Sequence, residues 1–583
     1  MKQYNSFSNA WEFVQLRNQE IADVFDQIAD ILEVLGEDKF KYLAYRRASR
    51  TLEGLSENIA DLIGKEKLTG IGKAIEEKIQ ELIETGHLKY YEELKKEVPS
   101  IIIEMTRIPD VGPKTAKLIY DKLKVKSLKE LEHAARSHAI QKIKGLGPKT
   151  EQSILGGISE LTKPQRHLLG VMRPIAQQIY YVLKDLKEVK QVSLAGSIRR
   201  WRETIRDIDI LVTSDQPNKV MDVFTSMELV SKVVAKGETK STVLVKDGVQ
   251  VDLRVVKDES YGAALQYFTG SKEHNVKLRT IVSQMGYKLN EYGVFLKDTE
   301  KKVAGETEEE VYQMFGMAWM PPELREDRGE IEAAMNKTLP NLVSLKDIKG
   351  DLHMHTNYSD GKSTIEEMVE AAKQIGYEYI AITDHTGNLQ VANAIDEATL
   401  LKQIEYIHNL DANDSKIRVL AGAEVNILPN GDLDLPDSVL SQLDIVVGSV
   451  HSKLRMPRDE MTQRVVKALS NEYLTILGHP TGQYLNKRPP SDIDLIKMFD
   501  AARDNAKILE INAYPPRLDL SDVNSRTANQ HSVLLAIGTD AHQASQFRFM
   551  ELGVSVARRG WLERKDLLNT RPTAALLKKL KIN

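Results

Sequence analysis

Apolar positions in the first hundred residues of the chain recur with a helical period. They are spaced three or four apart, as in Ile21, Val24, Phe25, Ile28, Ile31 and Leu32. On a helix this spacing gathers apolar side chains on one face, and the Lys- and Glu-rich positions between them fall on the other face. The pattern predicts a helical N-terminal domain over residues 1–100.

Three glycine-containing segments lie between helical stretches and share one pattern. The shared pattern is five consecutive positions: an apolar residue, any residue, Gly or Asp, a second apolar residue, and Gly. The segments that contain it are Leu68–Ala74, Ile108–Ala116 and Ile143–Thr150. Glycine lets the backbone approach a phosphate, and the N–H groups that open the next helix face the anion. One copy would also fit an ordinary turn, but three copies favour helix-hairpin-helix motifs that bind DNA without regard to its sequence. The glycines expected to contact DNA are Gly70, Gly72, Gly112, Gly145 and Gly147.

A strand with two acids follows further along the chain. Asp207 and Asp209 bracket one apolar residue and lead into the apolar run 210–212. Residues two apart on a strand project from the same face, so both carboxylates point one way. Like charges held that close repel unless a cation lies between them, and Mg²⁺ is the natural cation for oxygen ligands. Asp252, in the apolar run Val249–Val256, would complete a two-metal site.

A short segment just before these acids offers groups that bind phosphate. Gly196, Ser197 and Arg200 supply backbone N–H groups, a hydroxyl and a guanidinium. Asp-x-Asp pairs also occur at ordinary strand ends, and Gly-Ser pairs in ordinary turns. The order Gly-Ser, two arginines, Asp-x-Asp and a later strand Asp is more specific, and it predicts nucleotidyl transfer.

Beyond residue 350, apolar strands end repeatedly in histidine or an acid. The residues at or just after these strand ends are His353, His355, Asp360, His385, Glu424, His451, His479, Asp540 and His542. Strands that are separated by helical stretches and end in polar ligands describe a (β/α)7-type barrel with its site on the C-terminal face. A lone histidine at a strand end is usually structural, but this grouping favours a metal site, and imidazole with carboxylate suits Zn²⁺ or Mn²⁺.

Composition narrows the class of protein. A length of 583 residues predicts about four domains. The absence of cysteine excludes a disulfide framework and thiolate metal sites, and it suits a reducing compartment. No apolar run approaches the roughly 20 residues of a membrane span, and the N-terminus lacks the apolar core of a signal peptide. We therefore expect a soluble cytoplasmic protein without membrane contacts.

Overall charge does not indicate a nucleic-acid-binding protein. The chain has 80 Lys and Arg against 84 Asp and Glu, for a net charge of −4. A strongly basic protein would attract DNA through its overall field, but this one would not. Affinity for DNA must come from individually placed groups.

The motifs of residues 196–279 resemble the family X DNA polymerases, of the DNA polymerase beta type. The resemblance begins with the Gly-Ser, Arg-Arg and Asp-x-Asp segment. It continues in Lys236–Lys240, in Tyr267–Ser271, and in Asn275 and Arg279.

The resemblance implies a role for each of these residues. Asp207, Asp209 and Asp252 would hold two Mg²⁺ or Mn²⁺ ions, with Asp252 accepting the proton of the primer 3′-hydroxyl. The residues that hold the incoming nucleotide would be Ser197, Arg200, Tyr267, Gly270 and Asn275. The residues that contact DNA would be Lys240, Arg254 and Arg279.

Residues 1–100 resemble the small N-terminal domain of polymerase beta. In that family a lysine forms a Schiff base with the sugar at an abasic 5′ end, and Lys78 stands at the matching position. Lys41 and Tyr45 also match. A Schiff-base lysine must be partly neutral, whereas most lysines on a helix surface are solvated and charged. An ordinary solvated lysine is therefore the alternative interpretation of Lys78.

The second glycine segment carries a further implication of the same resemblance. The backbone carbonyls of Thr106, Ile108 and Val111 would hold a monovalent cation that bridges to a phosphate of the primer.

Roughly residues 340–583 resemble the polymerase and histidinol phosphatase (PHP) family, and all nine ligands of its trinuclear site are present. The resemblance implies three Zn²⁺ or Mn²⁺ ions. Their ligand sets would be His353, His355, Glu424 and Asp540; Glu424, His451 and His479; and Asp360, His385 and His542. A bridging hydroxide would attack phosphorus there.

Together the two resemblances give a domain plan for the chain. It comprises a helical N-terminal domain (1–100), a fingers-like helix-hairpin-helix region (101–170), an α+β nucleotidyltransferase palm (171–258), a thumb-like nucleotide-selection region (259–325), a linker (326–345) and a PHP phosphoesterase domain (346–583).

The function expected from this plan is that of a bacterial or archaeal repair polymerase. It would be a monomer associated with the nucleoid, and it would use dNTPs to fill short gaps in gapped, primed or 3′-ended duplex DNA. The PHP domain would act as a metal-dependent 3′–5′ exonuclease or process 3′ ends, and some relatives also cut at abasic sites. Two alternatives stay open: the barrel acts on a small phosphate ester, or it is a metal-braced scaffold that only positions DNA.

Overall fold

The computed structural model describes residues 14–54, 59, 63, 71–85, 87–106, 108, 111–161, 166–245, 248–387, 393–413 and 416–582. The chain divides into two compact units, Met1–Pro164 and Gln165–Asn583, which are treated separately below. Gly70, one of the glycines expected to contact DNA, lies outside the described residues.

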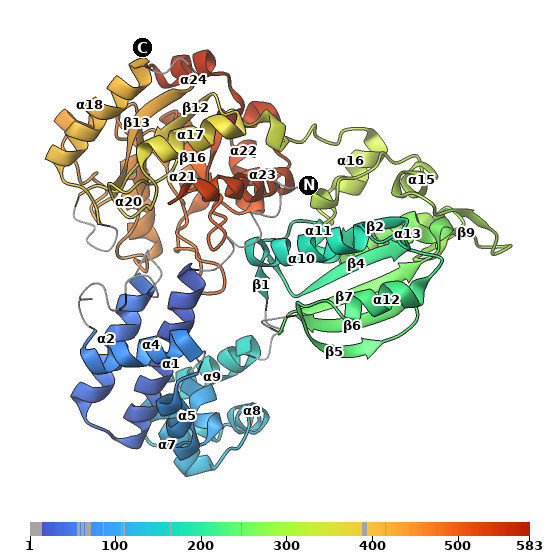
Figure 1. The fold of residues 1–583 in the computed structure, drawn as a ribbon, viewed down its shortest axis with the longest axis horizontal. Helices are drawn as coiled ribbons and strands as arrows, with labels where there is room; N and C mark the ends of the chain where they lie inside the picture. Colours follow the sequence, from blue (N-terminus) through green and yellow to red (C-terminus); the bar gives the residue numbers. More distant parts are fainter. Residues whose placement is uncertain are drawn as a thin grey trace. The chain divides into compact units, whose positions relative to one another are not determined.

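The first unit is helical throughout its described residues (Figure 1). Its helices are α1 (Val14–Leu35), α2 (Lys39–Gly54), α4 (Lys73–Thr85), α5 (Lys89–Glu97), α6 (Ser100–Thr106), α7 (Pro113–Leu123), α8 (Leu128–Arg136) and α9 (Pro148–Leu161). The apolar face predicted for the first helix is buried at Ile21, Phe25, Ile28 and Leu32, which pack in the core of this unit. The prediction of a helical N-terminal region is therefore confirmed.

Each glycine segment of the first unit opens a helix. Gly72, Gly112 and Gly147 directly precede α4, α7 and α9. Gly145 has a φ of +96°, which a residue with a side chain rarely adopts. The second segment thus lies between helices α6 and α7, and the third between the 3₁₀ turn Ile140–Lys142 and α9, as the sequence predicts. Of the first segment, the described residues show only the end that leads into α4.

The second unit begins with a five-stranded mixed sheet. The elements of this part of the unit, including the helices and a separate pair of short strands, are β1 (His167–Leu168), α10 (Leu169–Lys184), β2 (Gln191–Ala195), α11 (Gly196–Arg199), β3 (Thr204–Ile205), β4 (Asp207–Thr213), α12 (Pro217–Thr225), β5 (Val230–Lys236), β6 (Lys240–Val245) and β7 (Gln250–Val256). The strand order in the sheet is β2-β4-β7-β6-β5, and β1 pairs only with β3. The β4–β7 pair is parallel and the other three pairs are antiparallel. Figure 1 shows α10 and α12 beside this sheet.

A smaller α+β region follows the five-stranded sheet. Its elements are α13 (Tyr261–Thr269), α14 (Lys272–Gln284), β8 (Tyr287–Asn290), β9 (Gly293–Leu296), β10 (Lys302–Ala304), α15 (Glu308–Gln313) and α16 (Glu330–Asn336). The strands form an antiparallel sheet in the order β10-β9-β8. Helix α16 falls within residues 326–345, the expected linker, and buries Ile331 and Ala334 in the core of this region.

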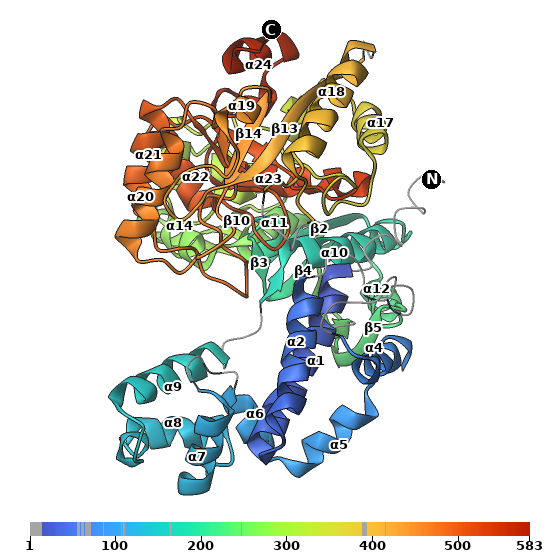
Figure 2. The same ribbon diagram turned by 90° about the vertical axis from the view of Figure 1, so that its left-hand side faces the viewer.

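The C-terminal part of the second unit alternates strands with helices. Its elements are β11 (Gly350–Asp351), α17 (Ile365–Ile375), β12 (Tyr379–Ile382), α18 (Glu397–Asn413), β13 (Arg418–Asn426), α19 (Asp437–Leu440), β14 (Ile445–Ser449), α20 (Arg458–Leu469), β15 (Ile476–Leu477), α21 (Leu495–Asp504), β16 (Ile508–Asn512), α22 (Asp522–Gln530), β17 (Leu535–Gly538), α23 (Met550–Arg559) and α24 (Thr573–Leu580). Figure 2 shows this part from a second direction, with helices around the strands.

These strands form a nearly closed parallel barrel, as the sequence predicts. Within the described residues, the seven strands of this C-terminal part, β11 to β17, pair in chain order. The chain just beyond the two end strands also pairs: the His355 N–H donates to the Ala541 carbonyl at 2.8 Å, and the Asp540 N–H to the His353 carbonyl at 2.9 Å. The strands β12, β14, β16 and β17 are buried at every position, because helices cover their outer face.

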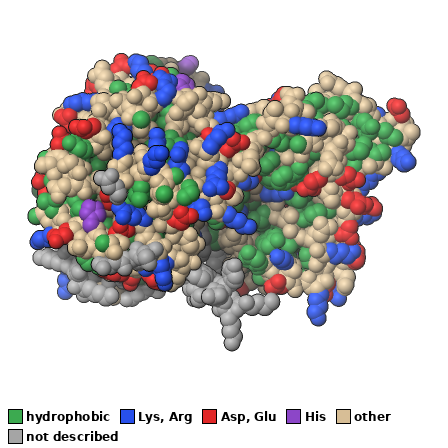
Figure 3. Space-filling view, turned by 90° about the horizontal axis from the view of Figure 1, so that it is seen from above, with side chains coloured by type: hydrophobic (Ala, Val, Ile, Leu, Met, Phe, Trp, Pro, Cys, Tyr) green, Lys and Arg blue, Asp and Glu red, His purple; other side chains and the backbone are tan. Residues whose placement is uncertain are grey.

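The surface carries charges of both signs. On the face that Figure 3 draws, basic and acidic side chains are interspersed, in keeping with a net charge of −4. Within the described residues, no helix is both long enough and apolar enough to cross a lipid bilayer.

A buried ion cluster joins the five-stranded sheet to the region that follows it. Glu308 accepts hydrogen bonds from Arg199 at 2.7 and 2.8 Å and from Arg325 at 2.6 and 3.1 Å. Burial raises the pKa of the Glu308 carboxyl, but the charges of Arg325 and Arg199 outweigh burial and lower that pKa below its usual value. One carboxylate therefore holds two guanidinium groups from different elements.

We expect Glu308→Gln to lower the free energy of unfolding by about 3–5 kcal/mol, because both arginines lose their shared partner. Because folding lowers the pKa of Glu308, its contribution is present above the pKa of the unfolded carboxyl and is lost as the pH falls through the folded value. The measurement is the melting temperature of both proteins at about pH 7 and about pH 3. The control is the exposed Glu309→Gln on the same helix, which should cost less than about 0.5 kcal/mol. Equal melting temperatures for the two variants at neutral pH would contradict this account.

Candidate functional site

The three acids predicted for the first metal site lie on neighbouring strands. Asp207 and Asp209 are on β4, and Asp252 is on β7, where it is the register partner of Asp209. Asp207 is two residues from Asp209, so it projects from the same face of the sheet. The parallel pairing of β4 with β7 thus brings all three carboxyl groups to one face.

Negative charge is crowded at this triad. Burial, and then the charges of Asp207 and Asp252, raise the pKa of Asp209 to about 6. Gly196 adjoins the same carboxyl: its φ is +64°, and a Cβ at this position would collide with Oδ2 of Asp209. A divalent cation relieves this kind of carboxylate repulsion, so the three acids fit the predicted Mg²⁺ or Mn²⁺.

Basic side chains border the triad. Lys240 Nζ lies 3.1 Å from Oδ2 of Asp252, and the Thr242 hydroxyl donates to Oδ1 of Asp252 at 2.6 Å. Lys240 is the register partner of Arg254, whose guanidinium carbon lies 4.4 Å from the centre of the Phe268 ring. Two of the residues expected to contact DNA, Lys240 and Arg254, therefore lie beside the triad.

Arg200, expected to hold the triphosphate, is held by a polar network. Its Nε donates to Glu326 at 3.0 Å, and its Nη1 donates to the carbonyl of Thr269. Gly270 follows Thr269 and leaves room for the guanidinium, since a Cβ there would lie 3.0 Å from Nη1 of Arg200. Ser197 is half-buried in α11, the helix that ends just before Arg200.

The other residues expected at the nucleotide lie on α13 and α14. The Asn275 side chain donates to the Tyr267 carbonyl at 2.7 Å and accepts from Gln266 at 2.7 Å. The Arg279 Nε donates to the Asn275 carbonyl at 3.2 Å, and its guanidinium lies 6.0 Å from the Tyr267 ring. The structure therefore brings Tyr267, Asn275 and Arg279 together.

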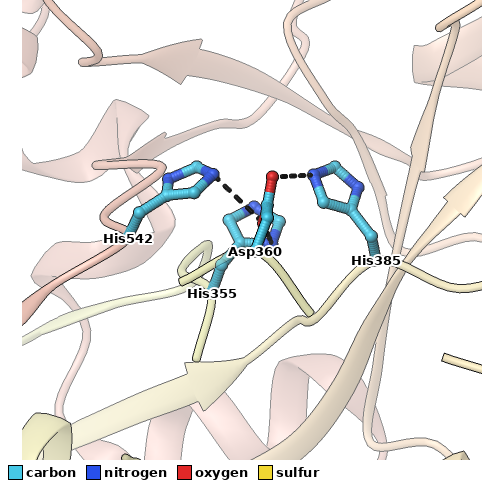
Figure 4. A group of neighbouring side chains, drawn as sticks. All are labelled: His355, Asp360, His385 and His542. Carbon is cyan, nitrogen blue, oxygen red and sulfur yellow. Dashed lines mark ion pairs between the residues drawn. The ribbon is translucent and has the colours of Figure 1, made fainter. Parts of the chain in front are cut away.

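All nine predicted ligands of the second site meet at one end of the barrel. Glu424, two residues before the end of β13, lies within 3.0–3.6 Å of an imidazole nitrogen of five histidines: His353, His355, His385, His451 and His479. Asp540 lies 3.1 Å from Nε2 of His355. Figure 4 shows His355, Asp360, His385 and His542 converging, with Asp360 3.4 Å from His542 and 3.7 Å from His385.

Three groups of these side chains have ligand atoms close enough to share a metal ion. The groups are His355, Asp360, His385 and His542; His353, His355 and Asp540; and His385, Glu424 and His451. The groups overlap the three ligand sets that the resemblance implies. They differ in that His355 joins Asp360, His385 and His542, and in that His385 joins Glu424 and His451. His479 contacts Glu424 at 3.0 Å.

The unused nitrogen atoms of these histidines fit a metal site. Within the described residues, Nε2 of His353, both ring nitrogens of His355, Nδ1 of His385 and Nε2 of His451 are buried without a well-formed hydrogen bond, although most of them lie 3.0–3.6 Å from Glu424 or Asp540. A buried polar atom without a partner is costly, and a coordinated cation is the partner that imidazole and carboxylate share. The buried His/Asp cluster is thus suited to binding metal.

The acids of the cluster are kept ionised by their neighbours. Burial raises the pKa of Glu424, but His385, His451 and His353 outweigh it and hold the pKa well below its usual value. Burial has the same effect on Asp540, and His355 and His353 overcome it. Both carboxyl groups are therefore in the form that coordinates a metal.

Glu510, which was not predicted from the sequence, contacts two histidines of this cluster. Its Oε1 lies 2.7 Å from Nδ1 of His353, and its Oε2 accepts from the His479 N–H at 2.6 Å. Gly538 makes room for it, because a Cβ there would collide with Oε1 of Glu510 and lie 2.6 Å from the Cβ of His353. A partner on the second nitrogen fixes the ring orientation of a metal-ligating histidine. The available signal was an acid inside the apolar strand Ile508–Asn512.

Lys78, in the first unit, lies beside two stacked aromatic rings. Its Nζ donates to the Ala74 carbonyl at 3.1 Å and lies 5.2 Å from the centre of the Tyr90 ring. Tyr90 stacks on Tyr45 with ring centres 6.1 Å apart. Lys78 thus has an aromatic neighbour, with Tyr45 behind it.

The carbonyl groups expected to hold a monovalent cation are only partly described. The carbonyl of Ile108 accepts from the Val111 N–H at 3.0 Å. Thr106 ends helix α6, and the residues between Thr106 and Ile108 and between Ile108 and Val111 lie outside the described residues. The proposed cation site stays a prediction.

Comparison with protein families assigns most of these regions. Residues 264–326 match the DNA polymerase beta thumb, and residues 351–513 match the PHP domain. Residues 16–88 match a helix-hairpin-helix domain, and residues 102–159 match a SAM-like helix-hairpin-helix tandem.

A full-length relative decides the family. The Bacillus subtilis (strain 168) protein named DNA polymerase/3′-5′ exonuclease PolX is 36% identical over 559 residues, which cover 95% of this chain and 98% of that protein. The chain belongs to the family X DNA polymerases. Within the family it is of the bacterial type, in which the thumb is followed by a PHP domain.

More distant relatives match parts of this family X polymerase. DNA polymerase lambda of Rattus norvegicus is 24% identical over 54% of this chain and 59% of that protein. A protein of Thermoanaerobacter sp. (strain X514) named probable phosphatase is 31% identical over 38% of this chain and 89% of that protein.

For the family X polymerase we expect Glu510→Gln to weaken metal binding about 10–100-fold, because the amide no longer fixes His353 as the carboxylate does. The measurement is a Mn²⁺ titration followed by calorimetry, with the metal content of the purified protein as a second readout. The control is Glu472→Gln, an exposed acid of the same domain. Unchanged Mn²⁺ affinity in Glu510→Gln would show that Glu510 has no part in the site.

Proposed function

We propose that this family X polymerase divides its two activities between the two acid-containing clusters. As a member of the family it is a DNA polymerase with 3′–5′ exonuclease activity. Extension is assigned to Asp207, Asp209 and Asp252, and hydrolysis to the histidine-rich cluster at the end of the barrel. The observation that carries the proposal is that both clusters are assembled within one chain related over its whole length to a polymerase/exonuclease.

In the proposed polymerase site, each side chain binds or orients a reactant. Arg200 and Ser197 hold the triphosphate, while Tyr267 and Asn275 contact the nucleotide. Asp252 accepts the proton of the primer 3′-hydroxyl, and Thr242 fixes the orientation of its carboxyl group. Lys240, Arg254 and Arg279 face the DNA backbone as phosphate contacts, which carry no sequence information.

In the proposed nuclease site, the histidine and acid side chains would hold the cations that bind the 3′-terminal phosphodiester. Glu424 and Asp540 are ionised carboxylates between imidazole groups, so they are suited to bridge cations. Glu510 and Asn426 orient His353 and His451 through hydrogen-bond distances of 2.7 Å.

Metal ions supply the charge for both reactions. Mg²⁺ or Mn²⁺ at the acids and Zn²⁺ or Mn²⁺ at the histidine-rich cluster would neutralise the negative charge that develops on the phosphoryl oxygens, and at the histidine-rich cluster they would also lower the pKa of water. Oxygen-only ligands favour the first pair of metals, and imidazole with carboxylate favours the second.

The proposed substrates follow from the family. They are dNTPs and gapped, primed or 3′-ended duplex DNA, and the proposed role is filling short gaps in DNA repair. The helix-hairpin-helix segments with Gly72, Gly112, Gly145 and Gly147 would bind the duplex backbone. The relative named probable phosphatase favours a second candidate for the barrel, the hydrolysis of a small phosphate ester.

We expect single substitutions to separate the two activities on a gapped primer with Mn²⁺. Asp209→Ala should abolish extension and leave degradation unchanged, because it removes a carboxylate of the triad. His355→Ala should abolish degradation and leave extension unchanged, because it removes an imidazole common to two of the three groups. Primer length on a denaturing gel measures both.

A nuclease activity that survives His355→Ala would contradict the assignment to the barrel. A wild-type barrel that cleaves p-nitrophenyl phosphate but leaves 3′-ended DNA intact would favour the small-ester alternative. The reciprocal pattern for Asp209→Ala tests the polymerase assignment independently.

We also propose a 5′-deoxyribose-phosphate lyase activity at Lys78. The proposal is supported by the position that Lys78 shares with the lyase lysine of the family, and by the aromatic pair Tyr90 and Tyr45 beside it. Borohydride should trap the protein on an incised abasic substrate through Lys78, and Lys78→Ala should remove the adduct. The control is Lys89→Ala, which changes an exposed lysine of the same unit. An undiminished adduct in Lys78→Ala would overturn the assignment.

A further inference from the structure

An arginine of the PHP domain reaches the polymerase part of the same unit. Arg559 is the last residue of α23, and its side chain is only 1% exposed. It donates to the carbonyl of Arg200 at 2.7 Å, to Glu326 at 3.0 Å and to Asp522 at 2.7 Å. Two of these three acceptors belong to the polymerase part, so the guanidinium lies between the two domains.

The same carboxylate oxygen serves both arginines. Oε1 of Glu326 accepts from Nε of Arg200 at 3.0 Å and from Nη1 of Arg559 at 3.0 Å. The Arg200 side chain also donates a hydrogen bond, through Nη1, to the Thr269 carbonyl. Arg559 therefore contributes to the orientation of Arg200 through Glu326 as well as through the Arg200 backbone.

The backbone contact fixes the segment that carries the predicted phosphate-binding residues. Helix α11 spans Gly196–Arg199, and Arg200 is its C-cap. The Arg200 N–H donates to the Gly196 carbonyl at 3.3 Å, and Arg559 binds the Arg200 carbonyl. A donor at the C-terminal end of a helix satisfies a carbonyl that lacks a partner within the helix.

The opposite side of Arg559 is anchored in the PHP domain. Asp522 accepts from Arg559 and also from Arg328 at 2.9 Å. Arg526 in turn donates to the Arg328 carbonyl at 2.9 Å. The network thus joins α22 and α23 to residues 326–328, and its buried charges have opposite charges as partners.

The two parts also pack closely beside this network. Gly170 on α10 has no room for a side chain, because a Cβ there would lie 2.7 Å from Pro515 and 3.1 Å from Leu552. A single hydrophobic cluster includes Leu169 of α10 and Leu552 of α23. A rigid contact of this kind lets α23 hold Arg559 at a fixed position relative to α11.

We propose that Arg559 is a positioning residue for nucleotide binding, so that the affinity of the polymerase site for dNTP depends on the PHP domain. The inference rests on the proposed role of Arg200 in holding the triphosphate. Without Arg559, Glu326 keeps one cationic partner and the Arg200 carbonyl loses its donor. Arg200 then spends less time in the binding orientation, and apparent affinity falls by the same fraction.

The test compares Arg559→Met with Arg558→Met in the full-length protein. Arg558 is the adjacent residue on α23 and also crosses to the polymerase part, where it donates to Glu323 at 2.7 Å and to the Val343 carbonyl at 2.9 Å. Both variants remove one guanidinium from the same interface, but only Arg559 contacts Arg200 and Glu326. Steady-state single-nucleotide insertion gives KM and kcat for dNTP.

We expect Arg559→Met to raise the KM for dNTP about tenfold with little change in kcat, because uniform binding is lost. Arg558→Met should leave both constants near wild type. Arg559→Lys should give a smaller rise, since a lysine keeps the charge but cannot bind three acceptors with a planar fork. Exonuclease activity of Arg559→Met should match wild type and shows that the PHP domain is folded.

Two outcomes would overturn the inference. One is an unchanged KM in Arg559→Met, and the other is an equal rise in Arg559→Met and Arg558→Met, which would indicate a general loosening of the interface. Arg200→Met separates this from the proposed function: a rise in KM in Arg200→Met without a rise in Arg559→Met refutes only the positioning role. An unchanged KM in Arg200→Met refutes the role of Arg200 itself, and the inference with it.

Discussion

The barrel depends on keeping a buried carboxylate charged. Glu424 is almost fully buried, and ionised groups in such surroundings cost several kcal/mol unless oppositely charged partners surround them. The groups that keep its pKa low are His385, His451 and His353, which come from three separate segments of the chain, so the strands must be in one register for them to meet. Gly538 shows how tightly this constraint acts, because a side chain there would displace Glu510 from His353.

The polymerase sheet also holds carboxylates close together, but fewer oppositely charged side chains surround them. Asp209 has two carboxylate neighbours, and its raised pKa reflects the energy of holding three acids on one face. Lys240 is paired with Asp252 at 3.1 Å and Arg206 with Asp207 at 2.8 Å, and the pKa of Asp209 is nevertheless raised. The triad therefore concentrates like charges that a bound cation would neutralise, whereas the barrel gathers imidazole and carboxylate ligands that a cation would share. They differ in ligand type, and that difference separates the metals and the chemistry.

The two sites lie in one structural unit, and the contacts between its parts are polar as well as apolar. Arg559 and Glu326 connect the PHP domain to the residue expected to hold the triphosphate. A polymerase and a nuclease joined only by a flexible tether would need no such contact. The buried network indicates instead that the PHP domain is part of the framework on which the polymerase site is built.

Features with a local period could be predicted from the sequence. The helical face of Ile21 and Phe25 and the Asp207–Asp209 pair follow from spacings of three to four and of two residues. Most of the barrel ligands could be predicted because they follow an apolar strand or lie close to its end, as Glu424 does in β13. Glu510 has the same place in β16, so the same signal could have predicted it. The Arg559–Glu326 contact joins residues 233 apart in sequence, and it depends on how two domains pack.

The central claim is that cations occupy two separate clusters of this chain. The most direct measurement is an anomalous difference map from a crystal of the full-length protein soaked in Mn²⁺. We predict peaks between Asp207, Asp209 and Asp252 and further peaks among the histidines around Glu424. A map with ordered side chains and no peak at either cluster, at a Mn²⁺ concentration that supports both activities, would contradict the account.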